Sequence, residues 1–214
     1  MTSWSEVTLL VAAALLLLLW LVWVSANRLD RLHRKVATSR AALENQLVRR
    51  ASAAAELASS GLLDPASSVL VGEAAWAALS AGGHGRAELV AALPDLDRML
   101  GPAGPGTRED DPVEHHVAES ELSRTVREAL ADDDEVAALV ARPGGRELAE
   151  ALAAGWYRVQ LARRFHNEAV AQAQRRRRKL VVRALRLAGH APVPQTVEID
   201  DDWPEALRRV AQAA

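Results

Sequence analysis

The feature that most constrains this chain is an uninterrupted apolar run near its start, from Val7 to Val24, in which Thr8 is the only mildly polar residue. An α-helix of this length measures about 27 Å, which is close to the thickness of the hydrocarbon core of a bilayer. Tryptophans, which favour membrane interfaces, lie near both ends of the run: Trp4, Trp20 and Trp23. We therefore predict that residues 1–26 comprise an extracellular N-terminal end and one membrane-spanning helix.

The charges that flank this run predict its orientation. Glu6 precedes it without any Lys or Arg, whereas four basic side chains follow it closely: Arg28, Arg31, Arg34 and Lys35. Because basic flanks stay in the cytoplasm, we expect the N-terminus outside the cell and the rest of the chain inside. The alternative is a cleaved signal peptide, since residues 24–26 resemble a small-residue cleavage site. The remaining chain would then be a secreted or envelope helical domain.

The rest of the sequence predicts an all-α fold. Hydrophobic residues make up 50% of the chain but aromatic residues only 4%, and a core of Ala, Leu and Val suits packed helices better than a β-sandwich or barrel. Nothing before Gly61 forces a break, so the membrane helix can continue into the bundle. A second long helix is expected from Arg146 to Leu187. We predict an antiparallel bundle of long helices in residues 27–190 and an acidic C-terminal tail in residues 191–214.

Shorter helices are expected between the two long ones. Asp64-Pro65 and Asp111-Pro112 each combine a capping aspartate with a proline suited to the first helical position. Residues 101–112 have the glycine and proline content of a loop. These signals predict four short helices, at about 66–80, 85–93, 113–131 and 134–141.

Basic side chains gather in two places that the predicted bundle would bring together. The net charge of −2 indicates no class of partner, but basic residues concentrate at 28–40 and 175–186. If the two long helices are antiparallel, both clusters lie at the membrane-proximal end, where an anionic inner leaflet attracts them. Apolar residues within 180–187 could also lie against the headgroups. The candidate membrane-surface contacts are Arg28, Arg31, Arg34, Lys35, Arg175, Arg176, Arg177, Arg178 and Lys179.

Two other interpretations of the basic clusters remain open. In the first interpretation, the charges only form solvated helix faces, and the cluster at 175–186 complements the dipole at the C-terminal end of its helix. In the other, residues 175–179, with the sequence RRRRK, contact the phosphates of a nucleic acid. No stacking aromatic residues or known reading motif surround this stretch, so we do not expect nucleic acid as a partner.

The sequence contains no recognisable catalytic or metal-binding motif. It has no Cys, which excludes disulfides, thiol nucleophiles and cysteine metal sites. Its six His residues form no paired zinc pattern, and the glycine-rich stretch at 101–106 lacks the Lys-Ser/Thr of a phosphate-binding loop. The carboxylates at 132–134 are interpreted as a solvated turn, and Trp156 and His166 as packing residues. We therefore expect no catalytic residue, no cofactor and no metal site.

Two parts of the chain resemble the LemA family of membrane-anchored helical proteins. Directly after the apolar run, Asn27-Arg28-Leu29-x-Arg31-Leu32 is followed by Gln46-Leu47-x-Arg49-Arg50. The last long helix contains Leu161-Ala162-Arg163-Arg164-Phe165-x-Asn167-x-Ala169-Val170. The resemblance implies an N-terminal anchor, a bundle of long antiparallel helices and no established catalytic activity. Its candidate functional residues are Asn27, Gln46, Arg49, Arg50, Arg163, Arg164, Phe165 and Asn167.

Taken together, the sequence predicts a non-enzymatic interaction or scaffold protein at the inner leaflet of a cell membrane. Its partners would be the membrane and an unidentified protein, and the sequence is also compatible with a homo-oligomer. A second hypothesis is that the chain regulates a membrane-associated enzyme, which would require a polar pocket with perturbed carboxylates. The excess of Arg over Lys and the abundance of Ala suggest a bacterial genome rich in G and C.

Overall fold

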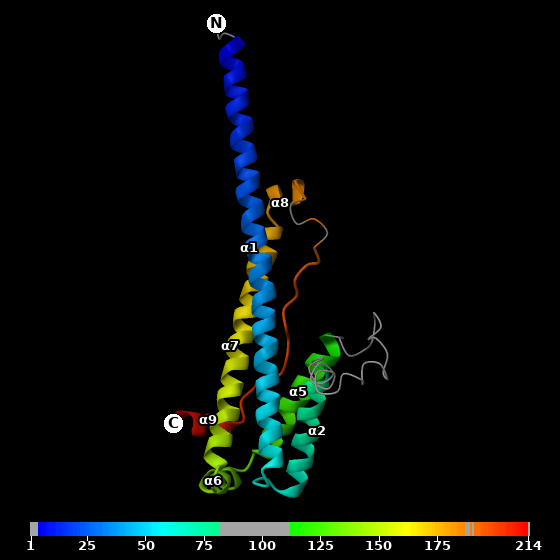
Figure 1. The fold of residues 1–214 in the computed structure, drawn as a ribbon, viewed down its shortest axis with the longest axis vertical. Coiled ribbons are helices and arrows are strands. Elements are labelled where there is room, and N and C mark those ends of the chain that lie inside the picture. Colours follow the sequence, from blue (N-terminus) through cyan, green and yellow to red (C-terminus); the bar gives the residue numbers. More distant parts are fainter. Residues whose placement is uncertain (1–3, 82–111, 187–188, 190, 214) are drawn as a thin grey trace, which may run out of the picture. The chain divides into compact units, whose positions relative to one another are not determined.

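The computed structural model describes residues 4–81, 112–186, 189 and 191–213 of the 214-residue chain. Within these ranges the regular secondary structure consists of seven α-helices without a β-strand, which confirms the all-α prediction. The expected helix at 85–93 and most of the expected loop at 101–112 lie outside the described residues. Figure 1 labels the helices in chain order: α1 (Trp4–Ser59), α2 (Pro65–Ala81), α5 (Pro112–Ala129), α6 (Asp133–Ala141), α7 (Gly145–Arg177), α8 (Leu180–Ala184) and α9 (Glu205–Ala213).

The apolar run and the first bundle helix form one continuous helix. α1 extends over 56 residues, and its sequence contains neither glycine nor proline. Gly61 follows shortly after its end with a φ of +72°, a left-handed conformation that glycine adopts without the steric cost of a Cβ atom. The predicted stop signal therefore lies where α1 ends.

The second long helix is shorter than the sequence predicts. α7 ends at Arg177, and the short helix α8 follows as a separate element. Lys179, between the two, has an extended backbone with φ −64° and ψ 136°. The expectation of one helix as far as Leu187 is therefore wrong. We attribute the break to residues 175–179, a run of cationic side chains that repel one another when they share a helix.

The predicted start signal at Asp64-Pro65 caps its helix as expected, whereas Asp111 lies outside the described residues. The Asp64 carboxylate accepts hydrogen bonds from the N–H groups of Ala66 and Ser67 at 2.9 and 3.1 Å, at the start of α2. Hydrogen bonds from Ser67 are the main reason that the pKa of Asp64 lies below its ordinary value. Asp132 caps α6 in the same way by accepting from the N–H of Asp134 at 2.8 Å. Local sequence is sufficient to set these boundaries.

The chain divides into two compact units, and both long helices contribute to each. Unit 1 comprises residues 1–40 and 165–196. Unit 2 comprises residues 41–164 and 197–214. The unit boundary therefore crosses α1 and α7 within their length, so that each unit contains one part of each long helix.

In unit 1, the described parts of α1 and α7 are antiparallel neighbours. Lys35 Nζ donates to Gln172 Oε1 at 3.3 Å, whereas Ser39, further along α1, lies 3.1 Å from His166 Nδ1, further back along α7. His166 is only 1% exposed, in agreement with its expected packing role. Small and aliphatic side chains fill the interior of this unit: Leu29, Ala169, Val170 and Ala173.

Unit 2 contains the larger hydrophobic core, which is built mainly from Ala, Leu and Val side chains of several helices. Within it α2 packs along α5. α7 approaches α1 closely at Gly155, because a Cβ atom added there would lie 3.3 Å from the Cα atom of Arg50. Trp156, beside this glycine, is fully buried as expected of a packing residue.

The C-terminal tail belongs to unit 2 from Val197 onward, whereas residues 191–196 belong to unit 1. Residues 197–204 have no regular secondary structure, yet Val197 and Ile199 are buried in a cluster with side chains of α1 and α7. α9 then follows, and its Leu207 is fully buried in the main core. The tail thus combines an acidic segment without regular secondary structure and a helix, and both supply apolar side chains that complete the core.

Candidate functional site

Among the described residues, α1 is the one helix that is long and apolar enough to cross a membrane. Its most apolar stretch has a mean hydropathy of 2.8, and none of that stretch is buried within the protein. The tryptophans Trp4, Trp20 and Trp23 are 90%, 57% and 62% exposed. A core helix would be covered by other elements, so the exposed surface of α1 is suited either to a bilayer or to removal with a signal sequence.

Unit 1 brings the two predicted basic clusters alongside one another. Lys35 of the first cluster contacts Gln172 of α7 directly. Because the two helices are antiparallel, one helical turn back along α1 brings Arg31 level with about residue 176. The cations that follow the apolar run and those at the end of α7 therefore contribute to one basic region, which we call the basic surface.

Most of the predicted membrane contacts on the basic surface are open to solvent. Arg176 is half-buried, and Arg177 is held within the fold because it donates to the carbonyl groups of Ala191 and Pro192 at 2.7 Å. The other members of the predicted set are exposed: Arg28, Arg31, Arg34, Lys35, Arg175, Arg178 and Lys179.

Two acidic side chains pair with cations of this surface. Asp30 accepts from Arg34 at 2.5 Å, and Glu168 accepts from Arg175 at 3.0 Å. Hydrogen bonds from Gln172 and Arg175 keep the pKa of Glu168 below its ordinary value. Both ion pairs are exposed, so each contributes little to stability, and the remaining cations keep the surface net positive.

The helix α8 places apolar side chains next to the basic surface. Leu180, Val181 and Leu185 are 80%, 51% and 48% exposed, whereas Val182 is only 2% exposed. Cationic residues flank and interrupt this apolar stretch: Arg178, Lys179, Arg183 and Arg186. Exposed apolar and basic residues in alternation are typical of segments that lie in a membrane interface.

The residues that carry the family resemblance differ in their surroundings. Gln46 and Asn167 are half-buried, and Arg50 and Arg163 form ion pairs inside unit 2. The other four are exposed: Asn27, Arg49, Arg164 and Phe165. Only these four of the set present their side chains to a prospective partner.

Arg50 is the centre of a buried polar cluster that the sequence analysis missed. Its side chain is inaccessible to solvent, and its Nη2 donates to the Glu119 carboxylate at 2.6 Å, while Nη1 donates to Ser123 Oγ at 3.0 Å. The guanidinium also lies 4.8 Å from the centre of the Trp156 ring, as in a cation–π contact. Glu119 and Ser123 are one turn apart on α5, and this polar pair was the available signal. The cluster joins α1, α5 and α7.

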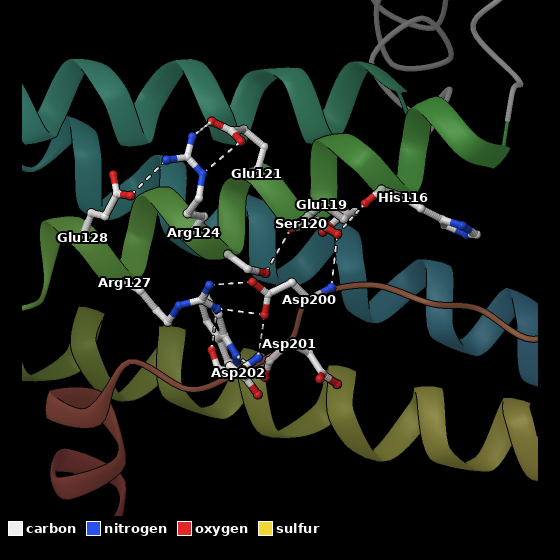
Figure 2. Close-up of polar contacts among 12 residues, drawn as sticks. His116, Glu119, Ser120, Glu121, Arg124, Arg127, Glu128, Asp200, Asp201 and Asp202 are labelled. Atoms are coloured by element: carbon white, nitrogen blue, oxygen red, sulfur yellow. Dashed lines mark hydrogen bonds and ion pairs between the residues drawn. The ribbon is translucent and has the colours of Figure 1, made fainter.

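A second polar network fastens the tail to α5, as Figure 2 shows. Arg127 donates from both terminal nitrogens to the Asp200 carboxylate, at 2.8 and 2.5 Å. The backbone N–H of Asp200 donates to Ser120 Oγ at 3.1 Å. The hydrogen bond with Arg127 lowers the pKa of Asp200 and raises the pKa of Arg127, so both groups stay charged.

The neighbouring Asp201 fastens the tail to α7. Arg163 donates from Nε and Nη2 to the two carboxylate oxygens of Asp201, at 2.8 and 2.9 Å. Trp156 Nε1 and Gln160 Nε2 both donate to its backbone carbonyl, at 3.0 and 2.8 Å. Arg163 therefore anchors the tail within unit 2 through an ion pair.

An open cleft of about 470 Å³ lies between α5 and the tail, and arginines engage two of its carboxylates, Glu121 and Asp200. Arg124 pairs with Glu121 and Glu128 on the same helix, beside the Arg127–Asp200 pair (Figure 2). Within the part of the chain that the structure describes, no group of three or more His, Asp or Glu residues is arranged to hold a metal ion. The cleft contains paired charges of both signs.

No protein-family model matches this chain, and no curated protein or solved structure is significantly similar to it. The functional interpretation accordingly depends on the surfaces and contacts described above.

Proposed function

We propose that the chain is a single-pass membrane protein whose helical bundle is a non-enzymatic interaction or scaffold module on the cytoplasmic side. Residues 1–26 supply the extracellular end and the anchor, and the basic surface holds the bundle against an anionic inner leaflet. The bundle binds an unidentified protein partner. This architecture agrees with what the resemblance to the LemA family implies.

The observation that carries the proposal is the continuity between the apolar run and the basic surface. α1 passes without a break from exposed apolar side chains to Arg28, and the contact between Lys35 and Gln172 brings the basic end of α7 beside it. Each Lys or Arg close to an anionic leaflet contributes about 1 kcal/mol to binding. Several exposed cations at this one position favour a bilayer whose inner leaflet faces the bundle.

Cysteine accessibility in cells tests both the anchor and its orientation. Because the chain has no native Cys, Thr2→Cys and Ala131→Cys report separately on the two sides of the membrane, and Ala131 is exposed between α5 and α6. A membrane-impermeant maleimide should label Thr2→Cys in intact cells and Ala131→Cys only after permeabilisation. Labelling of Ala131→Cys in intact cells would contradict the orientation. A mature protein that lacks residues 1–26 by mass spectrometry would support the signal peptide instead.

Site-specific photo-crosslinking in cells tests the interaction role. A crosslinking amino acid at Arg164 or Phe165, which are exposed motif residues, should give a discrete protein adduct in the membrane fraction. The same amino acid at Arg146, which is exposed on α7 outside the motif, is the matched control. Identical adducts at all three sites, or none at the motif sites, would argue against a specific protein partner at this part of α7.

A further inference from the structure

We propose that α8 is a second membrane contact, a short element whose apolar side chains enter the headgroup boundary of an anionic bilayer beside α1. The inference rests on the proposed function and adds to it a defined partner surface, an anionic lipid leaflet. The residues that make the contact are Leu180, Val181 and Leu185, which are apolar and exposed.

The exposure of the α1 side chains shows where other residues begin to cover this helix. The side chains from Glu6 to Leu21 are exposed to solvent. Cover begins at Val22, which is half-buried together with residues 24–26, and Leu29 is only 2% exposed. The part of α1 that other residues cover therefore begins at the end of the apolar run, which is the expected position of the bilayer surface.

α7 itself does not extend to this position. From the contact between Lys35 and Gln172, the last residue of α7, Arg177, is level with about residue 30 of α1. The returning chain is held at the same level, because the carbonyl groups of residues 191, 192 and 194 accept from Arg177 and Gln174. Among the described residues of unit 1, this leaves α8 and its flanking residues to cover α1 from Val22 to residue 26. In Figure 1, α8 follows the end of α7.

The two faces of α8 are suited to different surroundings. Val182 is 2% exposed and packs inward, whereas Leu180 is 80% exposed. The stretch of α1 assigned to the cover of α8 begins at Val22, which stands between Trp20 and Trp23 in the sequence, and these tryptophans are 57% and 62% exposed. Tryptophan favours the membrane interface, and apolar side chains at the same depth leave water when they enter the acyl boundary. The geometry thus places an uncovered apolar face where a bilayer would cover it.

The charge around α8 selects the type of lipid. Four cations lie within the stretch from Arg178 to Arg186, and the sequence contains no acidic residue between Arg178 and Gly189. A zwitterionic leaflet would take up the apolar side chains but offers little to these cations, whereas anionic headgroups neutralise them. An acidic protein surface would satisfy the charges as well, but the apolar run of α1 places a bilayer at this position.

Depth-dependent fluorescence in the full chain tests this contact. An environment-sensitive fluorophore on Val181→Cys, in a chain with no other Cys, is read out in vesicles that contain lipids brominated along their acyl chains. In vesicles rich in phosphatidylglycerol we expect a blue shift and strong quenching, and in pure phosphatidylcholine vesicles a much weaker response. Lys179→Gln and Arg183→Gln, both at exposed positions, should each reduce the ratio of inserted to free α8 about fivefold, which corresponds to about 1 kcal/mol per cation.

Two control sites separate this proposal from the anchor on which it rests. The fluorophore on Leu15→Cys, in the apolar run, should be quenched in both kinds of vesicle, and on the exposed Val69→Cys of α2 in neither. Quenching at Leu15→Cys without quenching at Val181→Cys overturns the role of α8 while the anchor stands. Absence of quenching at Leu15→Cys overturns the anchor itself. Equal quenching at Val181→Cys in both vesicles overturns the selection of anionic lipid.

Discussion

The buried ion pair between Arg50 and Glu119 provides a direct test of how unit 2 is held together. Arg50→Met removes the guanidinium and leaves the Glu119 carboxylate, which is 1% exposed, without its ion-pair partner. It also removes the donor to Ser123 and the cation over the Trp156 ring. Removal of one partner from a buried pair costs about 3–5 kcal/mol. A domain of this kind has a total unfolding free energy of about 5–15 kcal/mol, so the loss should be large.

The double variant distinguishes the cost of an orphaned charge from the value of the pair. Glu119→Gln keeps the shape of the side chain but leaves Arg50 as a buried cation, and we expect a loss of similar size. Arg50→Met combined with Glu119→Leu removes both charges, and such replacements are often neutral or stabilising. The double variant should therefore be more stable than either single variant, with a coupling energy of about 2 kcal/mol or more.

The measurement is urea unfolding of the full chain in detergent micelles, followed by far-ultraviolet circular dichroism. Arg49→Met is the matched control, since Arg49 is exposed next to Arg50, and its effect should stay within about 0.5 kcal/mol. Single variants as stable as the parent would refute the reasoning, because they would show that the two charges are not buried against one another. A double variant as unstable as the singles would show that packing, and not charge, determines the loss.

The other predictions concern the glycines, the tail and its response to acid. Gly155→Ala should destabilise unit 2 by about 1 kcal/mol, because the new Cβ atom would lie 3.3 Å from the Arg50 backbone. Gly72→Ala should stabilise unit 2 by up to about 1 kcal/mol, because its new Cβ atom would meet only Ala58 at 3.7 Å. Thermal unfolding of both variants and the parent compares these effects. Leu207→Ala should lower the free energy of unfolding by about 2–5 kcal/mol, because Leu207 is fully buried. Arg208→Ala, on the exposed side of α9, should change it little. Equal urea midpoints for the two variants would contradict a buried tail. The hydrogen bond from Arg127 holds the pKa of Asp200 below its ordinary value of 3.8, so the ion pair stabilises the fold at neutral pH. This stabilisation is lost in acid, below about pH 4, as Asp200 becomes protonated. Asp200→Asn should therefore be less stable than the parent at neutral pH, and its stability should fall less than that of the parent as the pH is lowered. Urea midpoints that change in parallel for variant and parent would refute the stabilising role of the Arg127–Asp200 pair.

Features that depend on neighbouring residues could be predicted from the sequence. The all-α class, the continuity of α1 and the start of α2 follow from the positions of glycine, proline and capping aspartates, which act over one helical turn. The break between α7 and α8 was missed because no glycine or proline marks it. The run of cations at 175–179 was interpreted as a surface for a partner and not as a stretch that weakens its own helix.

Features that depend on distant contacts could not be predicted in this way. Arg50 and Glu119 are 69 residues apart, and the spacing of Glu119 and Ser123 on one helix does not identify Arg50 as their partner. The tail is a stronger example, because its carboxylates at 200 and 201 suggest a solvated segment, although arginines of α5 and α7 engage both. The basic surface of unit 1 was accessible to sequence reasoning because it required only the clustering of charge and an antiparallel pair of helices.

The tail also determines when unit 2 can finish folding in the cell. The chain is synthesised from its N-terminus, at about 5–20 residues per second, so the apolar part of α1 emerges and can enter the membrane long before Leu207 exists. Until then, the cavity that Leu207 fills is empty, and Arg127 and Arg163 lack the carboxylates that they bind in the finished fold. In the proposed topology, the nascent chain is then tethered at the bilayer while its core is open. A premature stop before residue 197 would leave every product with an open core, and incompletely folded chains are removed by chaperones and proteases.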